Sequence, residues 1–225
     1  MTDARTATVD QAAVDQPVEE PIAVDRLGRL RLSNGWLYGT MLVSSLCGLV
    51  ASLVLSVDAL RLAEDQGVDL SCNINAVISC GTVANSWQAQ LFGFPNAFLG
   101  LIAEPVVITV AVAGLGGVRF PRWFMFAAQV VYAIGLGLAY WLFYQAMFHI
   151  GALCPWCLLI TVSTTFVFTT LTTVNVRDDN LFLPRRVQAA LTTGIRHHLD
   201  LMGVVIWVLL LALAVFVKYG SALFG

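Results

Sequence analysis

Long apolar stretches alternate with short polar connections along this chain, and the pattern predicts an integral membrane protein. Each apolar stretch is close to or above the roughly 20 residues that a membrane-spanning helix needs. The five stretches are Trp36–Val57, Ala97–Val118, Trp123–Ile150, Leu153–Val176 and Leu201–Tyr219. Between the third and the fourth, Gly151 and Pro155 predict a tight turn and a new helix start. We therefore expect an all-α fold with five transmembrane helices.

The polar stretches suggest how the chain is organised around these helices. Residues 1–25 carry six acids and one Arg, together with Pro17 and Pro21. This composition is typical of a disordered tail and excludes a secretory signal. The expected units are a cytoplasmic tail at 1–32, a main bundle at 33–180 with an external loop at 58–96, an inner-surface segment at 181–200 and a fifth transmembrane helix at 201–225.

Overall composition agrees with a lipid-facing surface. The chain is 58% hydrophobic and only 12% charged, whereas a soluble domain averages about 25% charged residues. Lipid, and not water, must therefore be the main solvent. The net charge of −2 comes without a basic patch, so no nucleic-acid partner is expected.

The basic residues predict which way the helices cross the membrane. If the N-terminus is cytoplasmic, only Arg61 and Lys218 fall on the outer side. The basic residues on the inner side would be Arg26, Arg29, Arg31, Arg119, Arg122, Arg177, Arg185, Arg186 and Arg196. This is the positive-inside bias of membrane proteins. The first external loop would carry the acids Asp58, Glu64, Asp65 and Asp69.

The connection before the last helix has two interpretations. Val187, Ala190, Leu191 and Ile195 form an apolar stripe, beside the basic residues Arg185, Arg186 and Arg196. Such a stripe favours a helix that lies on the inner membrane surface. An ordinary cytoplasmic loop fits the same residues.

Four of the five cysteines carry the most specific signal. Cys72 and Cys80 flank seven residues of the external loop, and Cys154-Pro155-Trp156-Cys157 stands at the outer end of the fourth helix. All four thus lie on the face where disulfides persist. Positions i and i+3 of a first helical turn lie on one side, and the positive helix end favours a thiolate. We expect a redox-active pair at Cys154–Cys157, with Cys72–Cys80 receiving electrons first.

Two other interpretations of these cysteines were weighed. A structural disulfide between Cys154 and Cys157 would close too short a loop to gain much stability. A four-cysteine zinc site would use two short-spaced pairs, but such sites usually fold soluble modules. We therefore expect no metal. Cys47, in the middle of the first helix, is expected to be a small buried apolar residue.

The segment after Cys80 predicts a cover over a pocket. Val83, Trp87 and Leu91 recur every four residues, which predicts a short amphipathic helix on the membrane surface. Its apolar face, with Phe92 and Phe94, would roof the outer ends of the helices. Simple interfacial anchoring by these aromatic residues is the alternative.

Three polar residues near the expected pocket were singled out. Asn96 opens the second helix, where it either caps that helix or donates a hydrogen bond to a carbonyl ligand. Glu104 lies within the second helix, and an intramembrane carboxylate is a functional candidate by default. Thr161 lies one helical turn below Cys157 on the same face.

Three motifs together resemble a known family. Cys72-x7-Cys80, Gly93-Phe94-Pro95-Asn96-Ala97 and Cys154-Pro155-Trp156-Cys157, in this order, resemble the vitamin K epoxide reductase family, and most closely its bacterial members of actinobacterial type. The resemblance covers roughly Trp36 to Val176. It implies that four of the helices form a bundle around a quinone, below a lid-like part of the external loop.

The resemblance also implies roles for individual residues. Cys72 would engage the partner protein, Cys80 would pass the disulfide to Cys154, and Cys157 would face the quinone. The expected quinone contacts are Asn96, Ser86, Trp87, Phe94 and Thr161. The family often has Tyr where this sequence has Thr161.

The function implied is that of a thiol–quinone oxidoreductase of a bacterial cytoplasmic membrane, which supports disulfide formation. Its electron acceptor would be menaquinone or a related vitamin K-type quinone. Because the chain stops at Gly225, where many bacterial members continue into a fused thioredoxin-like domain, the dithiol partner is expected to act in trans. That partner would be a secreted or membrane-tethered protein of thioredoxin-like or DsbA-like type. The rivals are a DsbB-like oxidase, whose usual motif order is reversed, and a non-enzymatic four-cysteine metal-binding membrane protein.

Overall fold

The computed structural model of the protein describes residues 30–75 and 77–224. The expected disordered tail at 1–32 therefore lies almost wholly outside the described residues. In the described part the chain is helical, and five helices are long and apolar enough to cross a membrane. The expected all-α, five-helix membrane architecture is confirmed.

The five long helices keep the order that the apolar stretches predict. They are α2 (Asn34–Glu64), α4 (Ala97–Leu115), α5 (Arg122–Gln145), α6 (Pro155–Arg177) and α8 (Leu199–Phe224). A π-helical turn, η3 (Ala146–Ile150), continues α5. Three shorter elements connect them, namely α3 (Cys80–Ala84), η2 (Trp87–Gln90) and α7 (Arg185–Arg196).

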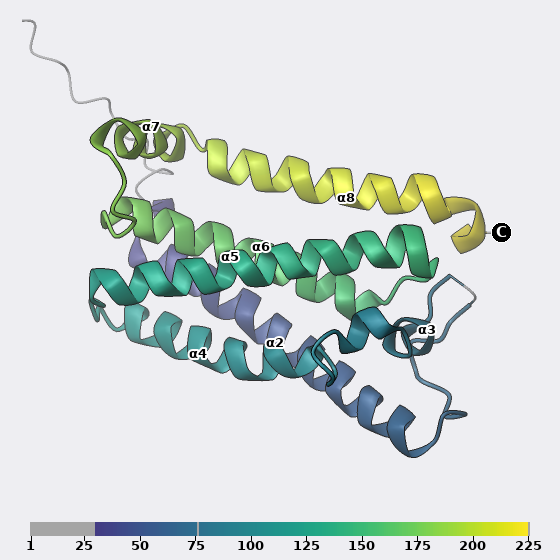
Figure 1. Ribbon diagram of the computed structural model, residues 1–225. Coiled ribbons are helices and arrows are strands. Elements are labelled where there is room, and N and C mark those ends of the chain that lie inside the picture. Colours follow the sequence, from purple (N-terminus) through teal and green to yellow (C-terminus); the bar gives the residue numbers. More distant parts are fainter. Residues whose placement is uncertain (1–29, 76, 225) are drawn as a thin grey trace, which may run out of the picture.

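Helix α2 is the centre of the bundle. It packs against both α4 and α6, and α5 packs against the other side of α6, whereas α8 runs along the outside (Figure 1). The main apolar core lies at the end of the bundle where α2 begins. It contains Leu37, Tyr38, Met41, Val107, Val110, Ala111, Met125, Tyr132, Val167, Leu171 and Val174. The opposite end, where the loops gather, holds two smaller buried clusters.

Buried amide groups join the helices at the packed end. Asn175 of α6 donates to the Met125 carbonyl at 3.1 Å and to Gln129 Oε1 at 3.0 Å, both on α5. Gln129 in turn donates to the Thr172 hydroxyl at 2.9 Å. Inside a membrane such bonds hold helices together because lipid offers these groups no alternative partner.

Helix α8 is attached to the bundle near its two ends and, between them, by the Trp207 ring N–H, which donates to the Tyr140 hydroxyl of α5 at 2.8 Å. Near its start Asp200 pairs with Arg31 and accepts a hydrogen bond from Thr173. Near its end Lys218 and Tyr219 both donate to the Met147 carbonyl in η3. Most of the apolar surface of α8 between these points is exposed.

The first helix is longer than its apolar stretch predicts. It continues past Val57 to Glu64, because four of the six residues that follow Asp58 are Ala or Leu and Leu62 is buried. Asp58, which was expected in the external loop, is consequently a buried residue of the helix.

The structure also tests the predictions for the segment after Cys80, the connection before the last helix and Cys47. The segment that contains Val83 and Trp87 forms two short helical pieces instead of one continuous helix, since Ser86 has extended backbone angles. The connection at 181–200 does form a helix, α7, so the loop interpretation is wrong. Cys47 is exposed on the surface of α2 and not buried.

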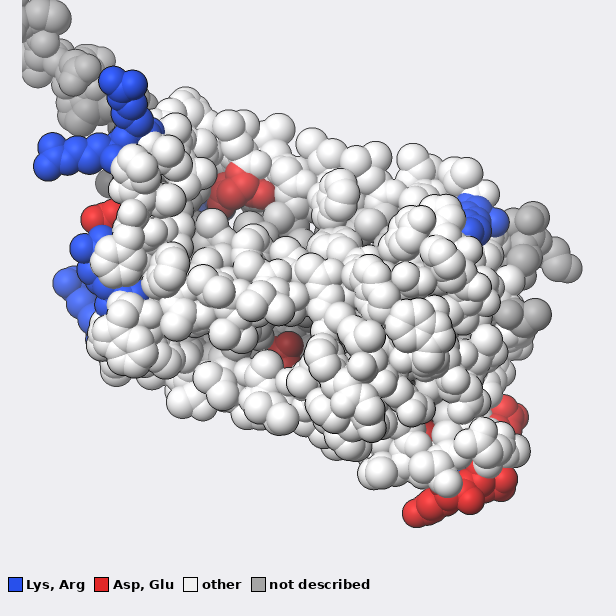
Figure 2. All heavy atoms as spheres, in the orientation of Figure 1, with Lys and Arg blue, Asp and Glu red and all other residues white. Residues whose placement is uncertain are grey.

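Charge is divided between the two ends of the bundle. Figure 2 shows most Lys and Arg side chains at the end that carries α7, and a group of acids at the opposite end, beside the loop that follows α2. This is the separation that the positions of the basic and acidic residues in the sequence predict.

The contact between α2 and α4 yields a stability prediction. A methyl group at Gly114 of α4 would overlap the ring of Tyr38 on α2. Overpacking of this kind destabilises by about 1–3 kcal/mol, so Gly114→Ala is expected to lower the unfolding temperature in detergent. Gly39→Ala is the matched control, because no atom lies within 4 Å of its added carbon. Equal stability of the two variants would contradict the packing described.

Candidate functional site

A short backbone pairing brings the two cysteine-bearing segments together. The Leu153 N–H donates to the Val77 carbonyl at 2.7 Å, and the Ser79 N–H donates to the Leu153 carbonyl at 3.1 Å. These two bonds align Ile78 and Leu153 as an isolated parallel bridge. Cys80 directly follows the first segment and Cys154 directly follows the second, so the pairing places them side by side.

Polar side chains of the loop between α2 and α3 fix the position of Cys80 at the start of α3. Asn73 Oδ1 accepts from the Gly81 N–H at 3.0 Å and from the Ser79 hydroxyl at 3.1 Å. The Ser79 hydroxyl in turn accepts from the Thr82 N–H at 3.2 Å and so caps α3. Cys80 is thereby held in a buried position.

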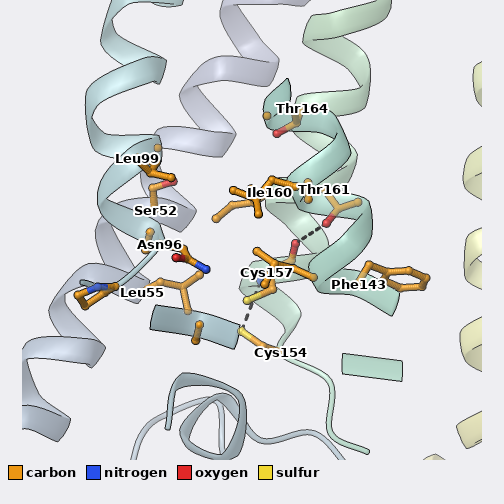
Figure 3. A pocket seen from close by; sticks show the side chains of 18 of the residues that line it. Ser52, Leu55, Asn96, Leu99, Phe143, Cys154, Cys157, Ile160, Thr161 and Thr164 are labelled. Carbon is orange, nitrogen blue, oxygen red and sulfur yellow. Dashed lines mark hydrogen bonds between the residues drawn. The ribbon is translucent and has the colours of Figure 1, made fainter. Parts of the chain in front are cut away.

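The structure brings all four predicted cysteines into one group. Cys72 and Cys80 form a disulfide, with their Cα atoms 5.6 Å apart. Cys154 Sγ lies 3.3 Å from Cys80 Sγ, and the Cys157 N–H donates to Cys154 Sγ at 3.4 Å (Figure 3). Cys154 and Cys157 are free thiols in this state. Cys154 Sγ is thus placed for exchange with the Cys72–Cys80 disulfide.

The start of α6 makes Cys154 the more acidic thiol. Cys154 is the N-cap residue and Pro155 follows at the first helical position. Hydrogen bonding from the Cys157 thiol lowers the pKa of the Cys154 thiol below its ordinary value, burial opposes this effect, and the N–H groups of Cys157 and Trp156 add to it. A helix N-terminus generally favours a thiolate in this way.

A cavity of about 510 Å³ extends from these sulfur atoms into the bundle. Cys80, Cys154 and Cys157 line one end of it, and most of the remaining lining is apolar. Ile102 of α4 and Ile134 of α5 also line it, and each is 69% exposed. The cavity therefore opens sideways between α4 and α5, where Figure 2 shows a hollow in the surface.

Three of the five expected contact residues lie on the cavity wall. Ser86, Asn96 and Thr161 line it, whereas Trp87 and Phe94 are not among the lining residues. Trp87 is 64% exposed and packs edge-on against Trp141, with the ring centres 6.0 Å apart. Phe94 stacks between Phe92 and Phe98.

The polar atoms of Asn96 and Thr161 differ in what they offer to a ligand. Asn96 Nδ2 donates to the Gln88 carbonyl at 2.7 Å, and its second N–H is left for another acceptor. Asn96 Oδ1 is buried and has no partner within the described part of the chain. The Thr161 hydroxyl donates to the Cys157 carbonyl at 2.9 Å, so toward the cavity it can only accept.

A carboxyl–phenol pair forms the deeper wall of the cavity. Glu104 and Tyr132 both line it, and the Tyr132 hydroxyl donates to Glu104 Oε2 at 3.2 Å. Gly48 of α2 leaves the space that Glu104 occupies, since an added carbon there would come within 2.8 Å of Glu104 Oε1. Sequence reasoning marked Glu104 but missed Tyr132, because a single Tyr in an apolar helix forms no motif.

Among the described residues no group of three or more His, Cys, Asp or Glu side chains is placed to hold a metal ion. Cys72 and Cys80 are bonded to each other and do not offer two thiolates. The geometry of the four cysteines is instead that of thiol–disulfide exchange.

The acidity of Cys154 can be tested in a chain whose only cysteines are Cys154 and Cys157. Loss of the Cys157 hydrogen bond removes the largest effect that lowers the Cys154 pKa. In the same background, Cys157→Ala is therefore expected to move the first thiolate titration to higher pH, measured by ultraviolet absorbance. An unchanged or lower midpoint would show that Cys157 does not stabilise the Cys154 thiolate.

Comparison with known proteins adds a family to this geometry. Residues 40–172 match the model of the Vitamin K epoxide reductase family, and a comparison with curated proteins found no match. The matched stretch is more than half of the chain and contains all four clustered cysteines. On this match, and with the same four cysteines gathered at one end of a membrane bundle, the chain belongs to the vitamin K epoxide reductase family.

Proposed function

We propose that the protein oxidises a dithiol protein through its two cysteine pairs and reduces a membrane quinone in the cavity beside Cys157. One observation carries the proposal: Cys154 Sγ lies 3.3 Å from the Cys72–Cys80 disulfide while Cys157 lines the cavity. Family membership supports it, because the family implies a membrane oxidoreductase that acts between thiols and quinones.

The sulfur arrangement supports a stepwise relay. A partner thiolate attacks Cys72, and Cys80 leaves as a thiolate. Cys80 attacks Cys154 of an oxidised Cys154–Cys157 pair, and Cys157 leaves as a thiolate. The second thiol of the partner releases Cys72 and completes the partner disulfide. Cys72 then attacks Cys80, restores the Cys72–Cys80 disulfide and frees Cys154, so that the Cys154–Cys157 pair holds two electrons.

The cavity has the properties that a quinone ring requires. A quinone accepts two electrons and two protons, and its ring is flat and apolar apart from its oxygen atoms. The unpartnered Asn96 Oδ1 suits the hydroxyl of the reduced ring, and the remaining Asn96 N–H suits a carbonyl of the oxidised ring. Ser86 and Thr161 are further contacts, and the sideways opening suits a long apolar tail such as that of menaquinone.

The partner and the membrane orientation complete the proposal. A secreted or membrane-tethered thioredoxin-like protein would act in trans at Cys72, on the outer face of a bacterial cytoplasmic membrane. The separation of charge between the ends supports a cytoplasmic N-terminus and outer cysteines (Figure 2). In this assignment residues 33–180 form the catalytic bundle and α3 and η2 cover it, while 181–200 lies on the inner surface and 201–225 forms the fifth transmembrane helix.

The relay assigns different roles to the two pairs. Anaerobic quinone reduction by the purified protein, driven by dithiothreitol, is expected to disappear in Cys157→Ser. It is expected to persist in Cys72→Ser and Cys80→Ser, because a small dithiol reaches Cys154–Cys157 directly. Removal of a catalytic nucleophile typically costs several orders of magnitude in rate.

The control for this assay is Cys47→Ser, since Cys47 is exposed on α2, away from the cysteine group. Full activity of Cys157→Ser would show that the relay is wrongly assigned.

The orientation is tested by single cysteines in a chain otherwise free of cysteine. Asp65→Cys and Arg186→Cys both occupy exposed positions. In intact cells an impermeant maleimide is expected to label Asp65→Cys at once and Arg186→Cys only after permeabilisation. The opposite result would reverse the assigned topology.

A further inference from the structure

A buried acid lies beside the sulfur relay. Asp58 is only 5% exposed, and its Oδ2 lies 3.9 Å from Cys72 Sγ. Cys72 itself belongs to a buried cluster with Leu62, Leu70, Cys80 and Cys154. The first external loop folds back over the end of α2 and so places an acid next to a reacting sulfur.

The other surroundings of Asp58 do not explain its burial. Within residues 30–75 and 77–224 its carboxylate forms no salt bridge, and the Cys72 sulfur is its one side-chain hydrogen-bonding neighbour. A buried carboxylate without a cation or hydrogen-bond donor is unfavourable. In the disulfide state Cys72 carries no proton, so Asp58 lacks a donor there. It gains one when Cys72 is released as a thiol.

We propose that Asp58 is the general base that takes the proton from the Cys72 thiol when Cys72 closes the disulfide with Cys80. The proposal rests on the proposed function, in which this step ends the thiol exchange. The Cys72 Sγ–Cys80 Sγ bond forms and the Cys80 Sγ–Cys154 Sγ bond breaks. The proton moves from Cys72 to Asp58 Oδ2, and the electron pair leaves with Cys154 Sγ.

The structure has the geometry of the product of this step. The Cys72–Cys80 bond is formed, Cys154 Sγ stands 3.3 Å from Cys80 Sγ, and the Cys157 N–H donates to Cys154 Sγ. Asp58 Oδ2 lies 3.9 Å from Cys72 Sγ, the attacking sulfur of this step. A base must be within reach of the proton that it removes, and Asp58 meets that requirement.

Electrostatics couples the proton transfer to the departure of Cys154. The negative charge of Asp58 raises the pKa of the Cys154 thiol and so opposes formation of its thiolate. When Asp58 takes the Cys72 proton, that charge disappears as the Cys154 thiolate forms. Among the described residues, the charged and titratable groups that interact with Asp58 are Cys72, Cys154 and the exposed Arg61, one turn further along α2.

The closing step can be measured without a partner protein. Fully reduced protein is mixed with excess menadione, quenched with acid and analysed by non-reducing peptide mapping. The quinone first oxidises Cys154–Cys157. The last two steps of the relay then follow, in which Cys80 attacks Cys154 and Cys72 closes the disulfide with Cys80. Wild type, Asp58→Asn and the control Glu64→Gln are compared, because Glu64 is an exposed acid at the end of the same helix.

Asp58→Asn is expected to form Cys154–Cys157 at the wild-type rate but to close Cys72–Cys80 about 100-fold more slowly, the usual effect of losing a general base. The Cys80–Cys154 species should accumulate, and raising the pH should restore closure. If the substitution instead displaced the loop that carries Cys72 and Cys80, the attack of Cys80 on Cys154 would be slow and the Cys80–Cys154 species would not accumulate. Glu64→Gln should behave as wild type. Asp58→Ser, a smaller neutral variant, is expected to show the same slow closure.

Two negative results are distinguishable. If wild type and Asp58→Asn close Cys72–Cys80 equally fast, Asp58 is not the base, and the proposed function stands. If menadione leaves Cys154–Cys157 reduced even in wild type, the proposed function fails and the role of Asp58 fails with it. Should Asp58→Asn fail to fold, the same comparison is decided by Asp58→Ser.

Discussion

Two backbone hydrogen bonds, from Leu153 to Val77 and from Ser79 to Leu153, hold together the two cysteine-bearing segments of this protein. Side chains in a bilayer gain little from burial against each other, so exact placement depends on directed polar bonds. Here the bonds join the loop before α3 to the turn before α6, and each of these segments is followed directly by a cysteine. Thiol exchange needs sulfur atoms in contact, and this pairing brings them there.

The features around that pairing each fix the position of one part of the site. Gly151, with φ of 74°, ends the π-helical turn and redirects the chain toward Cys154. Lys218 and Tyr219 of α8 hold the Met147 carbonyl in the same turn. The start of α6 supplies N–H groups to Cys154. The cavity then begins at Cys157, so the thiol chemistry and the apolar site share a single wall.

The sequence was sufficient to predict the features that depend on local properties. The number of long helices follows from the lengths of the apolar stretches, and the distribution of Arg predicted that the four cysteines would lie together, as they do. Ser86, Asn96 and Thr161 line the cavity, whereas Trp87 and Phe94 do not. The sequence predicted one regular helix for this segment, but the extended backbone at Ser86 interrupts it and changes the direction of the side chains that follow. Tyr132 and Asp58 became visible only in three dimensions, because the contacts of both join segments distant in sequence.

The uneven packing of the bundle has a consequence for how such a protein evolves. Its main apolar core lies near the start of α2, while the cavity that opens at Ile102 and Ile134 lies toward the other end. The residues of the main core and the residues that line the cavity are thus largely different sets. Substitutions along the opening can change the preferred ligand with little loss of stability, which leaves selection free to refit the site to whichever electron acceptor a membrane contains.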